Sequence, residues 1–216
     1  MGFVTRGLEV GAVLSTTSFL AGLATVAWLP DTVQLWGNIP IPRMLAILLI
    51  PVLAMVTSLF LALISSCDPY SPSQSSTSGA AIATVVALPP LFALPLQAIA
   101  LWAALTNHPI GTAPFAVLAS LLAFVLAIVF RHVEQNYVVG IRDLWTLRST
   151  RVWDDTHFVA SLAFIAAGSA GIVLVFFVPQ GVWQVALIVG LFGVPTALSV
   201  LYSYLIREDQ YQYIIR

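Results

Sequence analysis

Residues 158–206 read FVASLAFIAAGSAGIVLVFFVPQGVWQVALIVGLFGVPTALSVLYSYLI and contain no Asp, Glu, Lys, Arg or His. Pro179–Gly181 interrupts this apolar run with a short segment that is typical of a hairpin connection. A bilayer core of about 30 Å requires roughly 20 apolar residues in a helix. The stretch therefore predicts two membrane-spanning helices, Phe158–Val178 and Val182–Ile206.

The rest of the chain repeats this pattern. Only 8% of the 216 residues are charged and 60% are hydrophobic, whereas soluble domains carry about 25% charged residues. This composition excludes an ordinary cytosolic enzyme, a disordered regulator and a nucleic-acid-binding domain. We predict an all-α integral membrane protein with six transmembrane helices in one bundle, so that residues 1–216 form a single transmembrane domain. The four additional spans are expected at Val10–Leu29, Met44–Ile64, Gly79–Leu105 and Thr112–Phe130.

The arginines predict the orientation of these spans. All eight cationic residues are arginines, and six spans place both termini on one side of the membrane. Arg43 alone then lies on the opposite side. Since cytoplasmic loops are enriched in cations, both termini are expected in the cytoplasm. The seven residues on the predicted cytoplasmic side are Arg6, Arg131, Arg142, Arg148, Arg151, Arg207 and Arg216.

Polar groups are scarce at the centres of the predicted spans. The absence of ionisable residues there argues against proton-coupled pumps and voltage sensors. Gln97 is the most polar residue at depth, and it follows Pro89, Pro90 and Pro95, which should kink the third helix. One interpretation is a kinked packing helix in which Gln97 bonds to a freed carbonyl. The other is a broken helix that lines a substrate cavity, as in a small-solute transporter or channel component.

The connection between the fourth and fifth spans, residues 131–157, holds most of the polar chemistry. It reads RHVEQNYVVGIRDLWTLRSTRVWDDTH and has four of the eight arginines and four of the nine acidic residues. Gly140 permits a tight turn, and Asp143 is suited to capping a short helical turn. Ser149 or Thr150 is expected to cap the next helix.

The side chains of this cytoplasmic segment allow an interfacial role. Trp145 and Trp153 are expected to anchor it at headgroup depth. Arg142 is expected to contact anionic headgroups or the pair Asp154 and Asp155.

His157 is expected to donate a hydrogen bond to a backbone or carboxylate partner, and it is a candidate pH-sensitive switch. His157 could also form a metal site with His132, Asp154 and Asp155, but the spacing of these residues along the sequence matches no motif of metal ligands. A Ser/His/Asp hydrolase lacks a visible nucleophile elbow. We therefore predict that the protein is not an enzyme and binds no cofactor or metal.

The same segment resembles the SdpI family of multi-span bacterial membrane proteins. The family pattern runs approximately G-I-R-x-P-W-T-L and then V-W-x-x-T-H. Leu144 stands where the family usually has proline. The matching residues are Gly140, Ile141, Arg142, Trp145, Thr146, Leu147, Val152, Trp153, Thr156 and His157.

A weaker resemblance lies in the connection after the first span. Many relatives have an outside motif similar to L-P-x-x-V-P-x-H-x-N, and Pro30, Asp31 and Asn38 fit it. Gln34 replaces the second proline of this motif, and Trp36 replaces its histidine. The role of the outer histidine in relatives therefore does not carry over to this chain.

The resemblance implies a role in membrane immunity. A protein similar to the founding member would bind an amphipathic peptide toxin, or block its pore, in the membrane that it protects. It would also hold a cytoplasmic regulator at the membrane once the toxin is engaged, and it would bind no nucleic acid. The alternatives left open are the small-solute transporter and an accessory subunit of a membrane complex.

Overall fold

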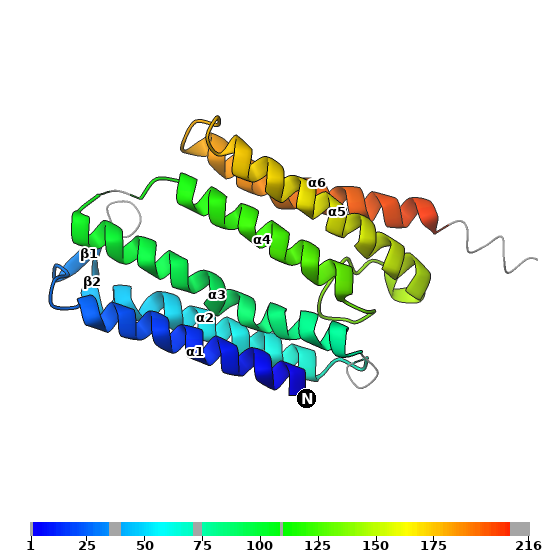
Figure 1. The fold of residues 1–216 in the computed structure, drawn as a ribbon, viewed down its shortest axis with the longest axis horizontal. Coiled ribbons are helices and arrows are strands. Elements are labelled where there is room, and N and C mark those ends of the chain that lie inside the picture. Colours follow the sequence, from blue (N-terminus) through cyan, green and yellow to red (C-terminus); the bar gives the residue numbers. More distant parts are fainter. Residues whose placement is uncertain (1, 35–39, 71–74, 109, 208–216) are drawn as a thin grey trace, which may run out of the picture. The chain divides into compact units, whose positions relative to one another are not determined.

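The computed structural model describes residues 2–34, 40–70, 75–108 and 110–207. Six of its helices are long and apolar enough to cross a membrane, which confirms the predicted all-α, six-span fold (Figure 1). A short hairpin and a 3-10 turn complete the secondary structure of the described residues. The elements are α1 (Gly2–Thr25), β1 (Thr32–Gln34), β2 (Pro40–Pro42), α2 (Arg43–Ser66), α3 (Ser76–Thr106), α4 (Ala113–His132), η2 (Thr146–Arg148), α5 (Thr150–Leu174) and α6 (Val182–Ile206).

The chain divides into two compact units. The first unit comprises Met1–Ser66 and Ala83–Ile110, and the second comprises Cys67–Ile82 and Gly111–Arg216. The division falls within α3, whose first turns belong to the second unit. The single transmembrane domain expected from the sequence stays a prediction, and each unit is described by itself below.

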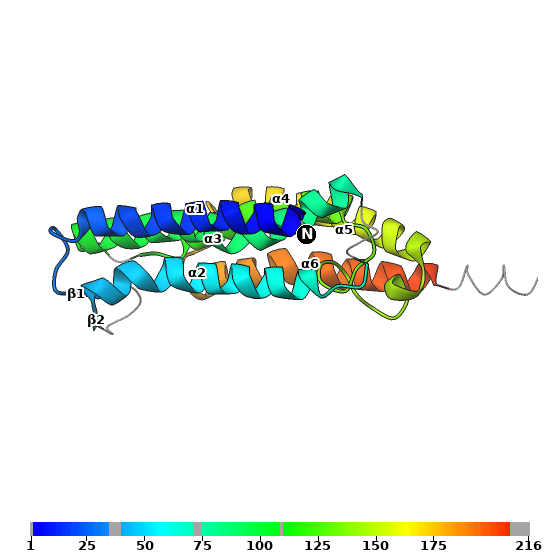
Figure 2. The same cartoon turned by 90° about the horizontal axis from the view of Figure 1, so that it is seen from below.

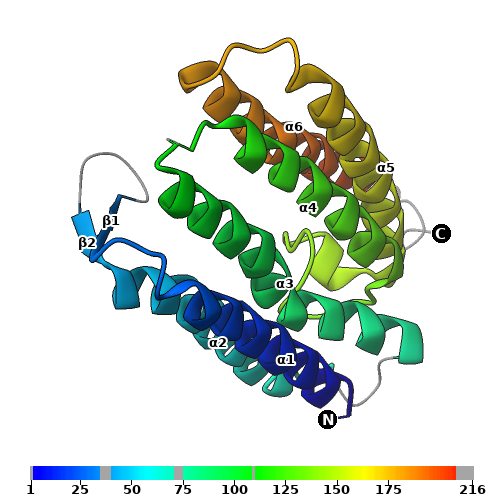
Figure 3. The same cartoon turned by 60° about the vertical axis from the view of Figure 1, so that its left-hand side comes forward.

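In the first unit, small residues of α1 allow close approach to α2 and α3, which run beside it (Figure 3). A Cβ atom added to Gly7 would lie 2.6 Å from the Ala83 carbonyl oxygen of α3. One added to Gly11 would lie 3.3 Å from both Pro90 of α3 and Ser58 of α2. The three helices therefore meet along one stripe of α1.

Strands β1 and β2 form an antiparallel hairpin between α1 and α2 that the sequence analysis did not predict (Figure 2). Arg43 closes it, because its backbone N–H donates to the Asp31 carbonyl over 3.0 Å and its guanidinium lies 3.4 Å from the Asp31 carboxylate. The hairpin side chain Val33 is buried in an apolar cluster with Leu29, Ile47 and Leu101. The hairpin thus covers the end of the three-helix unit.

Helix α3 is continuous through its three prolines. Pro90 cannot donate to the Val86 carbonyl four residues earlier. The Ser58 hydroxyl of α2 donates to that carbonyl instead. The broken-helix interpretation is therefore wrong, because a neighbouring helix supplies a hydrogen bond that the proline removes.

In the second unit, α5 packs against both α4 and α6, which also contact each other (Figure 3). Gly168 and Gly171 of α5 lie against Ser120 of α4, and Gly171 also lies against Leu191 of α6. Helix α1 differs most from its predicted span, because it covers Gly2–Thr25 rather than Val10–Leu29. Helix α5 begins at Thr150, where the sequence predicts a helix cap, so it starts before the predicted span Phe158–Val178 and ends at Leu174.

Candidate functional site

Residues 131–157, called the signature segment here, leave the end of α4, form a compact loop and return in the first turns of α5. Asn136 organises the beginning of this loop. Its side-chain oxygen accepts from the N–H groups of Val138 and Val139 at 2.8 and 2.7 Å, and its side-chain amide donates to the carbonyls of Glu134 and Val139. Asn136 is fully buried, so these local bonds satisfy its polar atoms.

The loop then turns at Gly140 and binds His157 of α5. Gly140 has a φ of +125°, as expected for the predicted tight turn. A Cβ atom at this position would overlap Nε2 of His157. The next residue, Ile141, donates its backbone N–H to that Nε2 atom over 2.9 Å. Glycine is required here both for its conformation and for this close approach.

His157 is held at both of its ring nitrogens. Because Nε2 accepts from Ile141, the ring proton lies on Nδ1, which donates to the Trp153 carbonyl over 2.8 Å. The expected donation to a backbone partner is confirmed. Both nitrogens of the neutral ring are occupied by backbone groups, so neither is available to a metal ion or a substrate.

Trp153 lies inside the second unit. Its exposed fraction is 0%, its Nε1–H donates to the Val133 carbonyl over 3.0 Å, and its ring stacks on His157 with 4.0 Å between centroids. The prediction that Trp153 is an anchor at headgroup depth is therefore wrong. The sequence suggested an anchor because tryptophan is common at interfaces, but here the carbonyl at the end of α4 satisfies the indole N–H.

Asp143 forms the predicted helical turn. Its Oδ1 accepts from the N–H groups of Trp145 and Thr146, both at 2.9 Å, and this turn leads into η2. Its Oδ2 accepts a hydrogen bond from the Ser203 hydroxyl near the end of α6. The Thr146 hydroxyl donates to the Ile141 carbonyl over 2.8 Å. The hydrogen bond between Ser203 and Asp143 joins the loop to α6.

Gln135 and the predicted cap Ser149 connect the loop to the start of α5. The Gln135 side-chain amide donates to the carbonyls of Thr146 and Leu147, and its oxygen accepts from the Thr150 hydroxyl. Ser149 is the N-cap of α5, and its hydroxyl oxygen accepts from the Val152 N–H over 3.3 Å. The predicted capping of this helix is confirmed.

The segment between α2 and α3 also binds the signature segment, which the sequence analysis missed. The buried Asp68 carboxylate accepts from the backbone N–H groups of Tyr70 and Tyr137, each at 3.0 Å. Glu134 accepts from the Ser75 N–H, and the Glu134 N–H donates to the Ser78 hydroxyl, both at 3.0 Å. The signal was an Asp-Pro pair followed by a Ser-rich stretch, which is typical of side-chain-to-backbone hydrogen bonding.

An exposed face remains on the outside of this network. The side chains of Leu144 and Tyr137 are 65% and 48% exposed. Arg142 and Arg148, which are close to them in the sequence, are also exposed. The ring centroids of Tyr137 and Tyr70 are 5.4 Å apart. Electrostatic repulsion from a deprotonated Tyr137 beside it raises the pKa of the Tyr70 phenol.

One predicted contact of the charged residues, that of Arg142, differs in the structure. The Arg142 guanidinium donates to the Tyr137 carbonyl rather than to the Asp154 and Asp155 pair. Asp155 instead pairs with Arg151 at 3.8 Å on an exposed surface. Among the residues that the structure describes, no three His, Cys, Asp or Glu side chains form a metal-binding group.

The side chains of the remaining candidate residues lie apart from this network or take no hydrogen bond in it. The Thr156 side chain is fully buried, and its hydroxyl has no hydrogen-bond partner among the described residues. Trp145 lies under the Arg207 guanidinium, 4.9 Å from the ring centroid. Pro30 and Asp31 are exposed before the hairpin, whereas Asn38 is outside the described residues. Gln97 is buried in the first unit.

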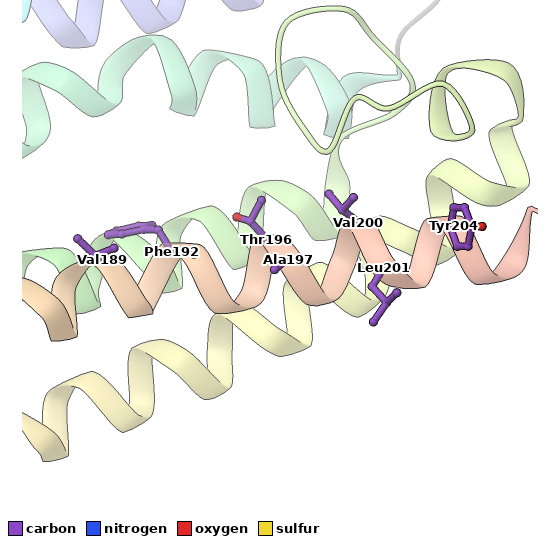
Figure 4. A pocket seen from close by; sticks show the side chains of 8 residues that line it. Val189, Phe192, Thr196, Ala197, Val200, Leu201 and Tyr204 are labelled. Atoms are coloured by element: carbon purple, nitrogen blue, oxygen red, sulfur yellow. The ribbon is translucent and has the colours of Figure 1, made fainter.

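A groove runs along α6 in the second unit (Figure 4). Its volume is about 900 Å³ and its lining is almost entirely apolar. Val189, Phe192, Thr196 and Val200 follow one side of the helix at intervals of three or four residues. Such a surface is typical of a helix that faces lipid or another membrane helix.

The comparison with known proteins agrees with this geometry. No curated protein and no solved structure matches the chain. Residues 132–203 match the SdpI/YfhL protein family, a region that begins at the last residue of α4, contains the loop and α5, and ends at Ser203 of α6. The match thus includes the hydrogen bond from Trp153 to the Val133 carbonyl near its beginning. It also includes the hydrogen bond from Ser203 to Asp143 at its end. Over this region, a third of the chain, the protein is similar to the SdpI/YfhL protein family, and its six long apolar helices are those of a multi-span helical membrane protein.

Proposed function

We propose that this chain is a bacterial immunity protein of the SdpI type, which protects the membrane that contains it against an amphipathic peptide toxin. The observation that carries the proposal is the family match over residues 132–203, which includes the whole loop of the signature segment. The hydrogen bonds of the signature residues give the loop a defined shape. Protection in this proposal requires neither catalysis nor a bound cofactor.

The distribution of arginine supports a cytoplasmic position for the loop. The signature segment contains four of the eight arginines, and Arg43 is at the start of α2, beside the hairpin. By the positive-inside rule, the segment and both termini face the cytoplasm of the bacterial cell. In this orientation the toxin meets the spans and the hairpin first, and the loop faces cytoplasmic proteins.

The exposed face of the loop is suited to a cytoplasmic regulator. This face combines aromatic, apolar and cationic side chains on a loop that is fixed by buried hydrogen bonds. The side chains are Tyr137, Leu144, Arg142 and Arg148. Aromatic residues and arginine are enriched in protein interfaces. We therefore assign recruitment to this exposed face and the shape of the loop to the buried residues Gly140, Trp153 and His157.

A survival assay tests the proposal. The chain is expressed in a bacterium that is sensitive to membrane-active peptides, which is then challenged with amphipathic toxins, the sporulation-delaying type first. We expect the wild-type chain to raise survival above that of the empty vector, and we expect Arg142→Ala to reduce it. His132→Ala is the matched control, because His132 is exposed at the end of α4, outside the loop.

A second pair of variants separates recruitment from folding. Leu144→Asp places a charge on the exposed face without removing a hydrogen bond, whereas Leu144→Met keeps the apolar character. We expect Leu144→Asp to lose signalling through the regulator and Leu144→Met to keep it. Equal protection by all of these variants would contradict the role of the exposed face, and lack of protection by wild-type protein in the membrane would contradict immunity.

A further inference from the structure

Four buried polar side chains of the first unit have no hydrogen-bond partner among the described residues: Ser15, Ser18, Ser65 and Gln97. Two of them, Ser18 and Gln97, lie at one level of the unit. The Gln97 side chain of α3 is 1% exposed, and neither its amide oxygen nor its amide nitrogen is bonded. The Ser18 hydroxyl of α1 is fully buried and also unbonded. A buried polar group that lacks a hydrogen bond costs roughly 1–3 kcal/mol. The expectation that Gln97 bonds to a freed carbonyl of its own helix is not met.

The contacts between α1 and α3 place these two residues opposite each other. Gly7 lies against Val86, and Gly11 lies against Pro90, so the two helices are parallel and in register. Seven residues, about two helical turns, separate Gly11 from Ser18 and also Pro90 from Gln97. Ser18 and Gln97 are therefore on the facing sides of α1 and α3 at the same level.

Helix α2 brings a third polar group to this level. Gly11 lies against Ser58 and Gly22 against Ile47, so α2 is antiparallel to α1, and Pro51 is opposite Ser18. Pro51 cannot donate to the Ile47 carbonyl, which points along the helix toward it. The Ile47 carbonyl therefore lacks its usual intrahelical partner at the level of Ser18.

The ends of the helices give an independent check of this register. Ser18 is about two turns from the end of α1 at Thr25, and Pro51 is about two turns from the start of α2 at Arg43. Gln97 is about two and a half turns from the end of α3 at Thr106. All three helix ends lie beside the hairpin, so the three positions share one depth (Figure 2).

We propose that Ser18, Gln97 and the Ile47 carbonyl hold one internal water molecule between α1, α2 and α3. A buried water typically makes about three hydrogen bonds to polar groups that the protein leaves unsatisfied. A water at this position donates one hydrogen bond to the Ile47 carbonyl and forms a second with the Ser18 hydroxyl. It forms the third with the Gln97 side chain, either by accepting from the amide N–H or by donating to the amide oxygen. Ile47 also belongs to the apolar cluster that contains Leu29, Val33 and Leu101.

The first test measures energetic coupling in a double-mutant cycle with Ser18→Ala and Gln97→Met, in the full chain in detergent. Met has nearly the shape of Gln, so the core stays filled. We expect the unfolding equilibrium constant of the double variant to differ from additivity by roughly fivefold. The control is Thr17→Val, because the exposed Thr17 hydroxyl bonds its own helix at Val13, and this variant should be additive with Gln97→Met.

The second test detects the water in the wild-type chain by solid-state NMR in lipid bilayers. Magnetisation transfer from water to the Gln97 side-chain amide protons should appear at short mixing times and weaken in Ser18→Ala. Additive free energies in the cycle would overturn the proposal. So would coupling without water transfer, which would indicate a direct bond between Ser18 and Gln97.

Discussion

The backbone N–H of Ile141 donates to Nε2 of His157, and this single bond of 2.9 Å fixes the tautomer of the imidazole and the path of the loop. The other ring nitrogen is bonded to the Trp153 carbonyl, so the ring is a structural bridge between the loop and α5. The bridge explains the spacing of four residues in the signature segment, because the turn at Gly140 and Ile141 has to meet the ring of His157 and the carbonyl of Trp153 on α5. These residues determine the shape of the loop, and this shape positions the exposed residues that we propose contact a regulator.

Gly140→Ala should destabilise the loop. The new Cβ would overlap His157 Nε2 at a φ of +125°, a combination of steric and backbone strain of about 1–3 kcal/mol. Thermal unfolding in detergent measures the loss. Gly190→Ala is the matched control, because its Cβ would meet no atom within 4 Å, and its stability should be unchanged or higher. Equal unfolding temperatures for wild type and Gly140→Ala would refute this account of the turn.

Asp143 and Ser203 should be energetically coupled, because the carboxylate accepts from a hydroxyl of α6 while it also bonds the turn at residues 145 and 146. Asp143→Ala should cost about 1–3 kcal/mol and Ser203→Ala less. A double-mutant cycle read by chemical unfolding checks this. Ser199→Ala serves as the control, since the Ser199 hydroxyl bonds its own helix at Pro195. Full additivity of Asp143→Ala and Ser203→Ala would argue against the contact.

Cys67 provides a test of orientation without any mutation. It is the chain's one cysteine, it is exposed, and it precedes Asp68, which binds the signature segment. A membrane-impermeant maleimide should label it in inverted vesicles but not in intact cells, because the proposed orientation places the loop in the cytoplasm. In a Cys67→Ser background, Asp31→Cys should show the opposite pattern. Labelling of Cys67 in intact cells would reverse the proposed orientation.

The sequence predicted the elements that depend on local patterns. Long apolar runs predicted the six spans, Gly140 predicted a tight turn, and Ser149 predicted the start of α5. Each of these follows from residues close to one another in the chain, where hydropathy, backbone freedom and capping act directly.

The missed features depend on partners far away in the sequence. Burial of Trp153 requires the Val133 carbonyl at the end of α4, and the buried Asp68 requires the Tyr137 N–H. Helix α3 stays continuous in part because Ser58 of another helix bonds the carbonyl that Pro90 cannot. Tertiary contacts overrode the predicted outcome for Trp153 and for the prolines of α3, and they bury Asp68, for which the sequence analysis made no prediction.

The most direct test of the central claim, that the signature residues fold the loop onto α5, is hydrogen exchange at the Ile141 amide. In the wild-type chain this amide should exchange slowly, and His157→Ala should accelerate its exchange roughly tenfold, because one buried hydrogen bond is worth about 1–1.5 kcal/mol. His132→Ala should leave the rate unchanged. Fast exchange of Ile141 in the wild type, or the same slow rate in His157→Ala, would contradict the claim.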